Sequence, residues 1–240
     1  MADQQRLGRV FVELADTLVT DFDVVEFMTI LAHRCVELLG AREAGVVLAD
    51  ERGLLRSVAS SHESAHLLEL FELQNQEGPC LDCYRTGEQI LNHSLAPDDD
   101  QWPNFAAEAR RLGFTTVHAL PMRLRGQAIG AVNIFAADGP ALSQAEIDVG
   151  QALADVATVG LLQERNLREA RLLSEQLQAA LDSRIVIEQA KGMLAERRNV
   201  ETGAAFDSLR SYARNTNRKL SDVAQAILDG RLSAEALDQH

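Results

Sequence analysis

Apolar residues recur with helical spacing in three stretches of the N-terminal half of the chain. Over residues 24–39 they fall three or four positions apart, which is the spacing of one buried helix face, and Gly40 follows as a helix end. The same period returns over residues 66–74 and over residues 103–112, where Pro103 suits a helix start. The pattern therefore predicts three helices in this half of the chain.

Between these helices the apolar residues alternate or run together over short spans, as they do in strands. The spans are residues 44–49, 54–59, 115–124 and 128–136. Short polar turns join them in pairs, which favours hairpins over parallel crossover connections. The predicted fold class is α+β, with an antiparallel sheet flanked by helices.

Residues 143–181 contain no proline and are rich in Ala, Leu, Gln, Glu and Arg, the residues that favour a helix. Ser143 and Glu146 have the spacing of a capping box, so one long helix is expected to begin there. Its apolar seam steps by three and four residues through Leu167, Ala170, Ser174, Leu177 and Leu181. This seam predicts a short parallel coiled coil in a homodimer. The alternative is a helix that packs only on the chain's own sheet.

A module of three helices is expected at residues 182–231. The long helix continues to about Arg198, and a second helix begins near Thr202. A third helix runs from an N-cap at Ser221 to Gly230. The second helix is expected to bury Phe206, Leu209 and Ala213. The chain thus divides into an N-terminal domain (1–142), a connecting helix (143–181), the module (182–231) and a tail (232–240).

Charge distinguishes the module from the rest of the chain. The 240 residues carry a formal net charge of −13, which disfavours polyanionic partners for most of the surface. Residues 183–231, however, hold 9 Lys and Arg against 6 Asp and Glu. A local positive excess favours contact with nucleic acid, and a chance fluctuation of charge is the alternative.

The composition also bears on location. No apolar run is long enough to span a membrane, and the first twenty residues do not have the pattern of a signal peptide. Three cysteines are too few for a disulfide framework. We therefore expect a cytoplasmic protein with no membrane partner.

Short motifs in the C-terminal module resemble the ANTAR family. They are Ser183–Arg184, Ile187–Gly192, Ala204 with Phe206, Leu209–Arg210, Asn217–Leu220 and Asp222–Ala224. In the N-terminal domain, EGPCLDCYRTGE at residues 77–88 and HALPMRLRGQAIGAVNIF at residues 118–135 look like a bacterial GAF sensor domain. The resemblance implies an RNA-binding transcription antiterminator. Such proteins hold paired stem-loops in nascent messenger RNA so that a terminator hairpin cannot form.

The candidate RNA-binding residues are Arg184, Lys191, Gly192, Arg210, Arg214, Asn217, Arg218 and Lys219. The cations offer contacts to phosphate, and the Asn217 amide can address a base edge. Gly192 removes side-chain bulk, so either RNA or a crossing helix could approach closely there. The alternative for the arginines is that they only solvate a helix face. Gly203 departs from the family pattern, because a better helix former or an acid is expected there.

Cys80 and Cys83 form a C-x-x-C pair that leaves three interpretations open: half of a zinc site, a regulated redox dithiol, or two inert thiols in a binding-pocket loop. His62 and His66 are the one pair that could complete a zinc site, but their order matches no zinc family, so no metal is expected. Cys83 also stands where the family resemblance leads us to expect a small residue.

Catalytic motifs are missing from the sequence. Ser60–Glu63 (SSHE) are adjacent in sequence, whereas the members of a catalytic triad come from separate elements. Neither glycine-rich phosphate-binding motif occurs. We therefore expect no enzyme and no cofactor, and an unknown small molecule or redox change as the input signal. The competing hypothesis is a small-molecule-binding or reductase-like GAF protein in which the C-terminal helices serve only for dimerisation.

Overall fold

The computed structural model describes residues 2–17, 23–97, 100–137 and 140–238, and the predicted tail extends beyond them at residues 239–240. The chain forms two compact units, residues 1–166 and 167–240. The helices of unit 1 are α1 (Ala2–Thr17), α2 (Val24–Leu39), α3 (Glu63–Asn75), α4 (Pro79–Thr86) and α5 (Pro103–Arg111). Its strands are β1 (Glu43–Ala49), β2 (Leu55–Ser60), β3 (Ile90–Ser94), β4 (Thr116–Leu124) and β5 (Gln127–Ala136). Helix α6 (Gln144–Arg198) runs from unit 1 into unit 2, where α7 (Thr202–Asn215), α8 (Leu220–Leu228) and the 3₁₀ helix η1 (Glu235–Asp238) follow.

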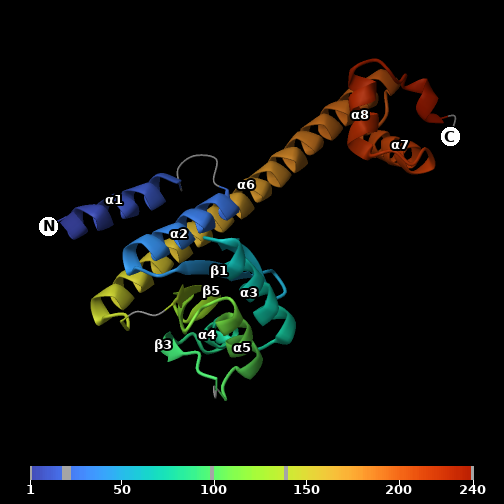
Figure 1. Cartoon of the computed structure of the whole chain (residues 1–240). Coiled ribbons are helices and arrows are strands. Elements are labelled where there is room, and N and C mark those ends of the chain that lie inside the picture. Colours follow the sequence, from blue (N-terminus) through green and yellow to red (C-terminus); the bar gives the residue numbers. More distant parts are fainter. Residues whose placement is uncertain (1, 18–22, 98–99, 138–139, 239–240) are drawn as a thin grey trace. The chain divides into compact units, whose positions relative to one another are not determined.

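Unit 1 is a three-layer arrangement around an antiparallel sheet with the strand order β2-β1-β5-β4-β3. Helices α1 and α2 and the first part of α6 share one core on one face of the sheet, while α3, α4 and α5 cover the other face (Figure 1). This strand order leaves β2 at one edge of the sheet, where it contacts α3, while α4 packs on β4 and β5. The predicted α+β class is confirmed.

The predicted helix over residues 24–39 is confirmed as α2. The side chain of Asp23 accepts hydrogen bonds from the backbone N–H groups of Val25 and Glu26, and Gly40 ends the helix with φ 62°. Its buried face contains Phe27, Met28, Leu31, Ala32, Cys35 and Leu39. Helical period alone thus located this element and most of its buried face.

The capping box at the start of α6 is also present. Glu146 Oε2 accepts from Ser143 N at 2.7 Å and from Ser143 Oγ at 2.6 Å, and Glu146 N donates to Ser143 Oγ at 3.4 Å. Early in α6, Leu153, Ala154 and Ala157 are buried in the core of unit 1. From residue 165 to residue 182 every side chain is exposed. The seam residues lie in this stretch, so they are not packed on the chain's own sheet.

Unit 2 has a core of its own, formed by the end of α6 with α7, α8 and η1. Two details of the sequence prediction are wrong here. Helix α8 begins at Leu220 after an extended Lys219, because the half-buried Leu220 packs against this core and Ser221 is therefore already inside the helix. Helix α7 buries Leu209 and Ala213 as predicted, together with Ala205 and Tyr212, whereas Phe206 is only half-buried because Ala205 packs into the core in its place.

Four described elements were not predicted: α1, α4, β3 and η1. Helix α4 matters most for the site, because the C-x-x-C pair lies on it and the expected loop at Cys80 and Cys83 is wrong. Pro79 opens α4 as its first residue, and Gly87 closes it in a left-handed conformation with φ 69°. A helix of 8 residues is too short to show a helical period, but its end signals are in the sequence.

Candidate functional site

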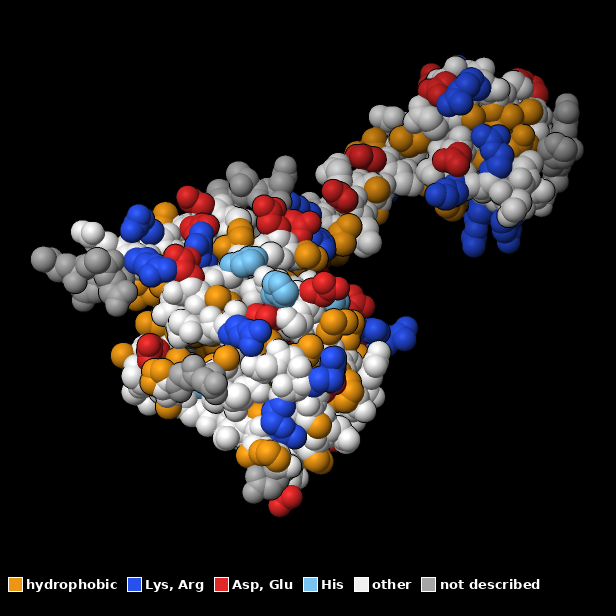
Figure 2. Space-filling view, in the orientation of Figure 1, with side chains coloured by type: hydrophobic (Ala, Val, Ile, Leu, Met, Phe, Trp, Pro, Cys, Tyr) orange, Lys and Arg blue, Asp and Glu red, His pale blue; other side chains and the backbone are white. Residues whose placement is uncertain are grey.

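The basic side chains expected to contact RNA lie at the surface of unit 2 (Figure 2). Arg210, Arg214, Arg218 and Lys219 are exposed and, among the described residues, form no ion pair. Lys191 is half-buried, and its Nζ forms an ion pair with the Glu188 carboxylate one helical turn earlier. The cations at the end of α7 and in the turn after it are therefore available to phosphate groups.

A tight turn at the end of α7 holds three of these residues together. Asn217 adopts a left-handed conformation with φ 52°. Asn217 N donates to Arg214 O at 3.2 Å, and Arg218 N donates to Ala213 O at 2.9 Å. These bonds form a helix-ending motif in which Asn replaces the usual glycine. The motif fixes the backbone from Arg214 to Arg218 and leaves the Asn217 amide exposed.

Gly192 and Arg184 lie on α6. They are apart in sequence from the cationic patch, which consists of Arg210, Arg214, Arg218 and Lys219. Gly192 is exposed, and a Cβ atom built on it would meet nothing within 4 Å. The described part of the chain therefore supplies no packing reason for this glycine. Tyr212, an aromatic residue in the same stretch as the patch, is buried in the core of unit 2 and does not present its ring to a base.

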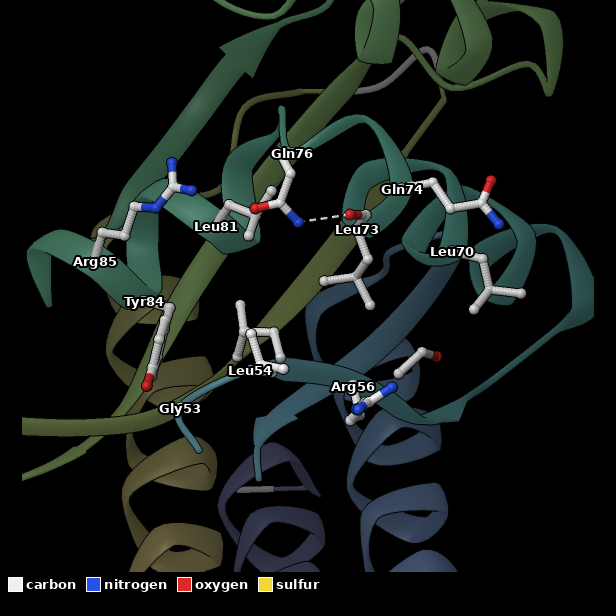
Figure 3. Close-up of a pocket in the computed structure, with 12 residues that line it drawn as sticks. Gly53, Leu54, Arg56, Leu70, Leu73, Gln74, Gln76, Leu81, Tyr84 and Arg85 are labelled. Atoms are coloured by element: carbon white, nitrogen blue, oxygen red, sulfur yellow. Dashed lines mark hydrogen bonds between the residues drawn. The ribbon is translucent and has the colours of Figure 1, made fainter. Parts of the chain in front are cut away.

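A pocket of about 590 Å³ lies in unit 1, where the start of β2 faces the end of α3 and α4 (Figure 3). Its walls are mainly apolar. The lining residues are Gly53, Leu54, Leu55, Arg56, Ser57, Leu70, Leu73, Gln74, Gln76, Leu81, Tyr84 and Arg85. Its volume lies within the range of small-molecule sites.

Two acids of α3 are buried next to lining residues of this pocket. Glu69 Oε2 accepts from Ser57 Oγ at 2.6 Å, and Ser57 is itself a lining residue. Glu72 accepts from Leu81 N at 3.0 Å and from Asn133 Nδ2 at 3.0 Å, so it joins α3 to α4 and to β5. Burial raises the pKa of Glu72 to about 8 and raises the pKa of Glu69 well above its ordinary value.

Glycine makes room for the Glu69 carboxyl group. A Cβ atom on Gly45 would lie 2.1 Å from Glu69 Oε1, and Gly45 stands opposite Asn133 in the β1–β5 pairing. Glu69 Oε1 and Asn133 Oδ1 are both buried and have no hydrogen-bond partner among the described residues. A carboxyl group that carries a proton suits this buried position better than a carboxylate, because burial disfavours the charged form.

The two thiols of the C-x-x-C pair are buried beside these acids, in contact with Val47, Ala119 and Ala131. Burial raises the pKa of Cys83 to about 12 and that of Cys80 well above its ordinary value. Both thiols are therefore protonated at neutral pH, which disfavours thiolate chemistry. His62 is exposed at the N-cap of α3, and no three His, Cys, Asp or Glu side chains among the described residues are grouped to hold a metal ion.

Sequence reasoning missed the pocket arginines and the buried acids. Glu69 and Glu72 lie in the leucine-rich segment HLLELFELQN, where period alone assigns the leucines to the core and the glutamates to solvent. The structure reverses this for part of the helix: Glu69 and Glu72 are buried, and Leu67 and Leu70 are exposed. Nothing in the local pattern signals this reversal.

Two family models match the chain. The GAF domain model matches residues 23–162, and the ANTAR domain model matches residues 175–228. A comparison with curated protein sequences finds no match. None of the described helices combines the length and apolar character that a membrane span requires.

Solved structures similar to this chain share the fold of unit 1. Residues 122 to 287 of a methyl-accepting chemotaxis protein are 18% identical with a TM-score of 0.51, over 66% of this chain and 98% of that one. The GAF domain of a phosphoenolpyruvate-protein phosphotransferase from Coxiella burnetii is 15% identical with a TM-score of 0.53, over 68% and 96%. Free methionine-R-sulfoxide reductase from Neisseria meningitidis, solved with its substrate, is 14% identical with a TM-score of 0.51, over 67% and 91%.

Proposed function

The chain belongs to the GAF domain family and carries an ANTAR domain near its C-terminus, and from this we propose that it is a signal-responsive, RNA-binding transcription antiterminator. In this proposal the GAF domain receives a signal. The ANTAR domain then binds paired stem-loops in nascent RNA in the cytoplasm. We assign the input to residues 1–142, the connection to residues 143–181 and RNA binding to residues 182–231.

The observation that carries the proposal is the exposed cationic patch on α7 and the turn after it. Arg210, Arg214, Arg218 and Lys219 have no ion-pair partner among the described residues of a chain with net charge −13. Neighbouring unpaired cations repel one another, which costs electrostatic free energy unless an anionic partner is bound. RNA phosphate is such a partner. Arg184, Lys191, Gly192 and Asn217 complete the proposed RNA surface.

The proposed coupling is a two-state change in a homodimer. Leu167, Leu177 and Leu181 are each more than half exposed, and they lie on one face of α6. Pairing of this face between two chains would bury it. A ligand that binds the two states of the paired helices unequally would then change the spacing of two cationic patches against two RNA loops.

The test is a salt titration of RNA binding by the full chain. The variant Arg214→Ala/Arg218→Ala should bind every RNA more weakly. The plot of log affinity against log salt should become shallower by about 1.5, because two phosphate contacts are lost. Both side chains are exposed, so the circular dichroism spectrum and melting temperature should stay near those of the parent.

The matched control is Arg52→Ala/Arg165→Ala, which removes the same charge from exposed positions of unit 1. This control should keep the salt slope of the parent. A folded Arg214→Ala/Arg218→Ala variant that binds RNA as tightly as the parent at physiological salt would refute the RNA-binding role of the patch.

The competing function, a reductase-like GAF protein, depends on a reactive thiol. The burial and raised pKa of Cys80 and Cys83 count against it, because the thiolate is the reactive form. RNA binding by the full chain separates the two functions, because the competing hypothesis gives the C-terminal helices a role in dimerisation only.

A further inference from the structure

Helix α3 turns leucine side chains toward the pocket of unit 1 while it buries two acids. Leu70 and Leu73 line the pocket, and Leu70 is 37% exposed. On the same helix Glu69 and Glu72 are fully buried. Burial of carboxyl groups in place of leucines costs free energy, so the fold gains nothing in stability from this orientation. It does give the pocket an apolar wall.

The remaining wall continues this apolar surface. Leu54 and Leu55 come from the start of β2, and Leu81 and Tyr84 come from α4. Figure 3 shows the labelled leucines and Tyr84 around one hollow. The Tyr84 hydroxyl would lie 3.8 Å from a Cβ atom on Gly53 and has no hydrogen-bond partner among the described residues. It offers a hydrogen-bond donor at the end of an apolar hollow.

All charged residues of the lining are cations. Arg56 and Arg85 line the pocket, and none of its lining residues is an acid, although the chain has 36 Asp and Glu against 23 Lys and Arg. In Figure 3 Arg85 lies near Leu81 and Tyr84, and Arg56 lies near Leu54 on another part of the lining. An apolar hollow with two guanidinium groups in its lining is complementary to an amphiphilic anion.

The acids nearest to these arginines also accept from other donors. Arg56 Nε and Nη2 both donate to Asp50 Oδ2 at 3.3 Å, while Asp50 Oδ1 accepts from the N–H groups of Arg52 and Leu54. Asp82 lies 3.8 Å from Arg85 Nη1, and its Oδ2 accepts from Trp102 Nε1 at 2.9 Å. Such long, exposed ion pairs are weak. A bound anion can therefore compete for either guanidinium group.

We propose that this pocket binds a small organic anion with an apolar body, the body lying on the leucines and the carboxylate or phosphate group pairing with Arg56 or Arg85. The inference deepens the input half of the proposed function and rests on it for the role of the ligand as a signal. The binding itself is measured without RNA, so it stands or fails independently of RNA binding.

The experiment is calorimetric titration of the full chain with octanoate, octylamine and octanol, three probes that share a tail of eight carbons and differ in charge. Octanoate should bind at least about tenfold more tightly than octylamine, because the lining pairs with an anion and repels a cation. Octyl phosphate, which has the same alkyl tail length, serves as a second anion, and its binding relative to octanoate distinguishes a phosphate ligand from a carboxylate ligand.

Variants then test the residues. Arg56→Ala/Arg85→Ala should remove most of the preference for octanoate over octylamine. Arg9→Ala/Arg165→Ala removes the same charge from exposed positions of unit 1 outside the pocket lining and should keep this preference. Leu70→Asp, at an exposed position of the wall, should weaken octanoate by about tenfold and leave the circular dichroism spectrum unchanged. The proposal is overturned if neither anion binds at millimolar concentration, if octylamine binds as tightly as octanoate, or if the folded double-arginine variant keeps the preference.

Discussion

At the scale of single residues, the buried acids make stability depend on pH. The pKa of Glu72 is raised to about 8 and that of Glu69 well above 4.5, whereas both acids ionise near 4.5 in the unfolded chain. The folded state therefore keeps protons that the unfolded state loses. The contribution of these two acids to the free energy of unfolding should be complete below about pH 4.5 and should be lost as pH rises toward 8. Each acid contributes a slope of up to about 1.4 kcal/mol per pH unit.

Urea unfolding between pH 5.5 and 8 measures this slope. Glu72→Gln should roughly halve the slope of the unfolding free energy against pH, because the neutral amide does not bind a proton. Glu63→Gln, at an exposed position on the same helix, is the matched control and should leave it unchanged. A parent protein as stable at pH 8 as at pH 5.5 would contradict the protonation of these acids in the folded state.

The two thiols on α4 are predicted to be inert. Cys80→Ala/Cys83→Ala should leave RNA affinity unchanged both with and without hydrogen peroxide, because buried thiols with raised pKa are poor nucleophiles. A loss of stability on the order of 1 kcal/mol per residue is expected. Cys35→Ala, on the opposite face of the sheet, is the control. An oxidant response that is present in the parent and lost only in the double variant would favour a redox input instead.

Asn217 is predicted to act through its amide, although its backbone also ends α7. Asn217→Gly keeps the left-handed conformation and removes the amide, so the fold should persist. This variant should narrow the affinity gap between an RNA selected for binding to the parent and the same RNA with a scrambled loop. Asn217→Ala additionally strains the turn by about 1 to 2 kcal/mol. Equal loop discrimination by Asn217→Gly and the parent would assign Asn217 a purely structural role.

At the scale of elements, the exposed stripe of α6 predicts a dimer. Leu177→Glu/Leu181→Glu places like charges at the expected seam and should convert a micromolar dimer into a monomer in sedimentation experiments. Leu172→Glu is the control, because Leu172 is 53% exposed but lies on the opposite side of the helix. A parent protein that is monomeric at this concentration would exclude a preformed pair of RNA-binding modules.

At the scale of the whole molecule, input and output are predicted to be linked reciprocally. If octanoate changes the affinity for RNA by some factor, RNA must change the affinity for octanoate by the same factor. Titration of each ligand in the presence and absence of the other measures both factors. Arg56→Ala/Arg85→Ala should abolish the effect of octanoate on RNA binding while leaving binding to RNA alone near the parent's. If octanoate binds at the pocket without altering RNA affinity, the pocket is a binding site without a signalling role.

Local patterns in the sequence were enough to locate α2 and α6 and their ends, but not α1, which is as long as α2. Residues 24–39, the capping box at Ser143 and Glu146, and the end of α6 near Arg198 were all predicted, because period and end signals act within a few residues. The motifs of the C-terminal module were also sufficient to indicate its family, since they depend on residue identity and spacing alone.

Tertiary structure alone decided which faces of the elements are buried. On α3 it buried Glu69 and Glu72 and turned Leu70 to the pocket, and on α7 it chose Ala205 over Phe206. It also placed Arg56 and Arg85, which are 29 residues apart, beside the same hollow. The physical reason is that a helix or strand presents several faces of comparable hydrophobicity, and only packing against distant parts of the chain selects among them.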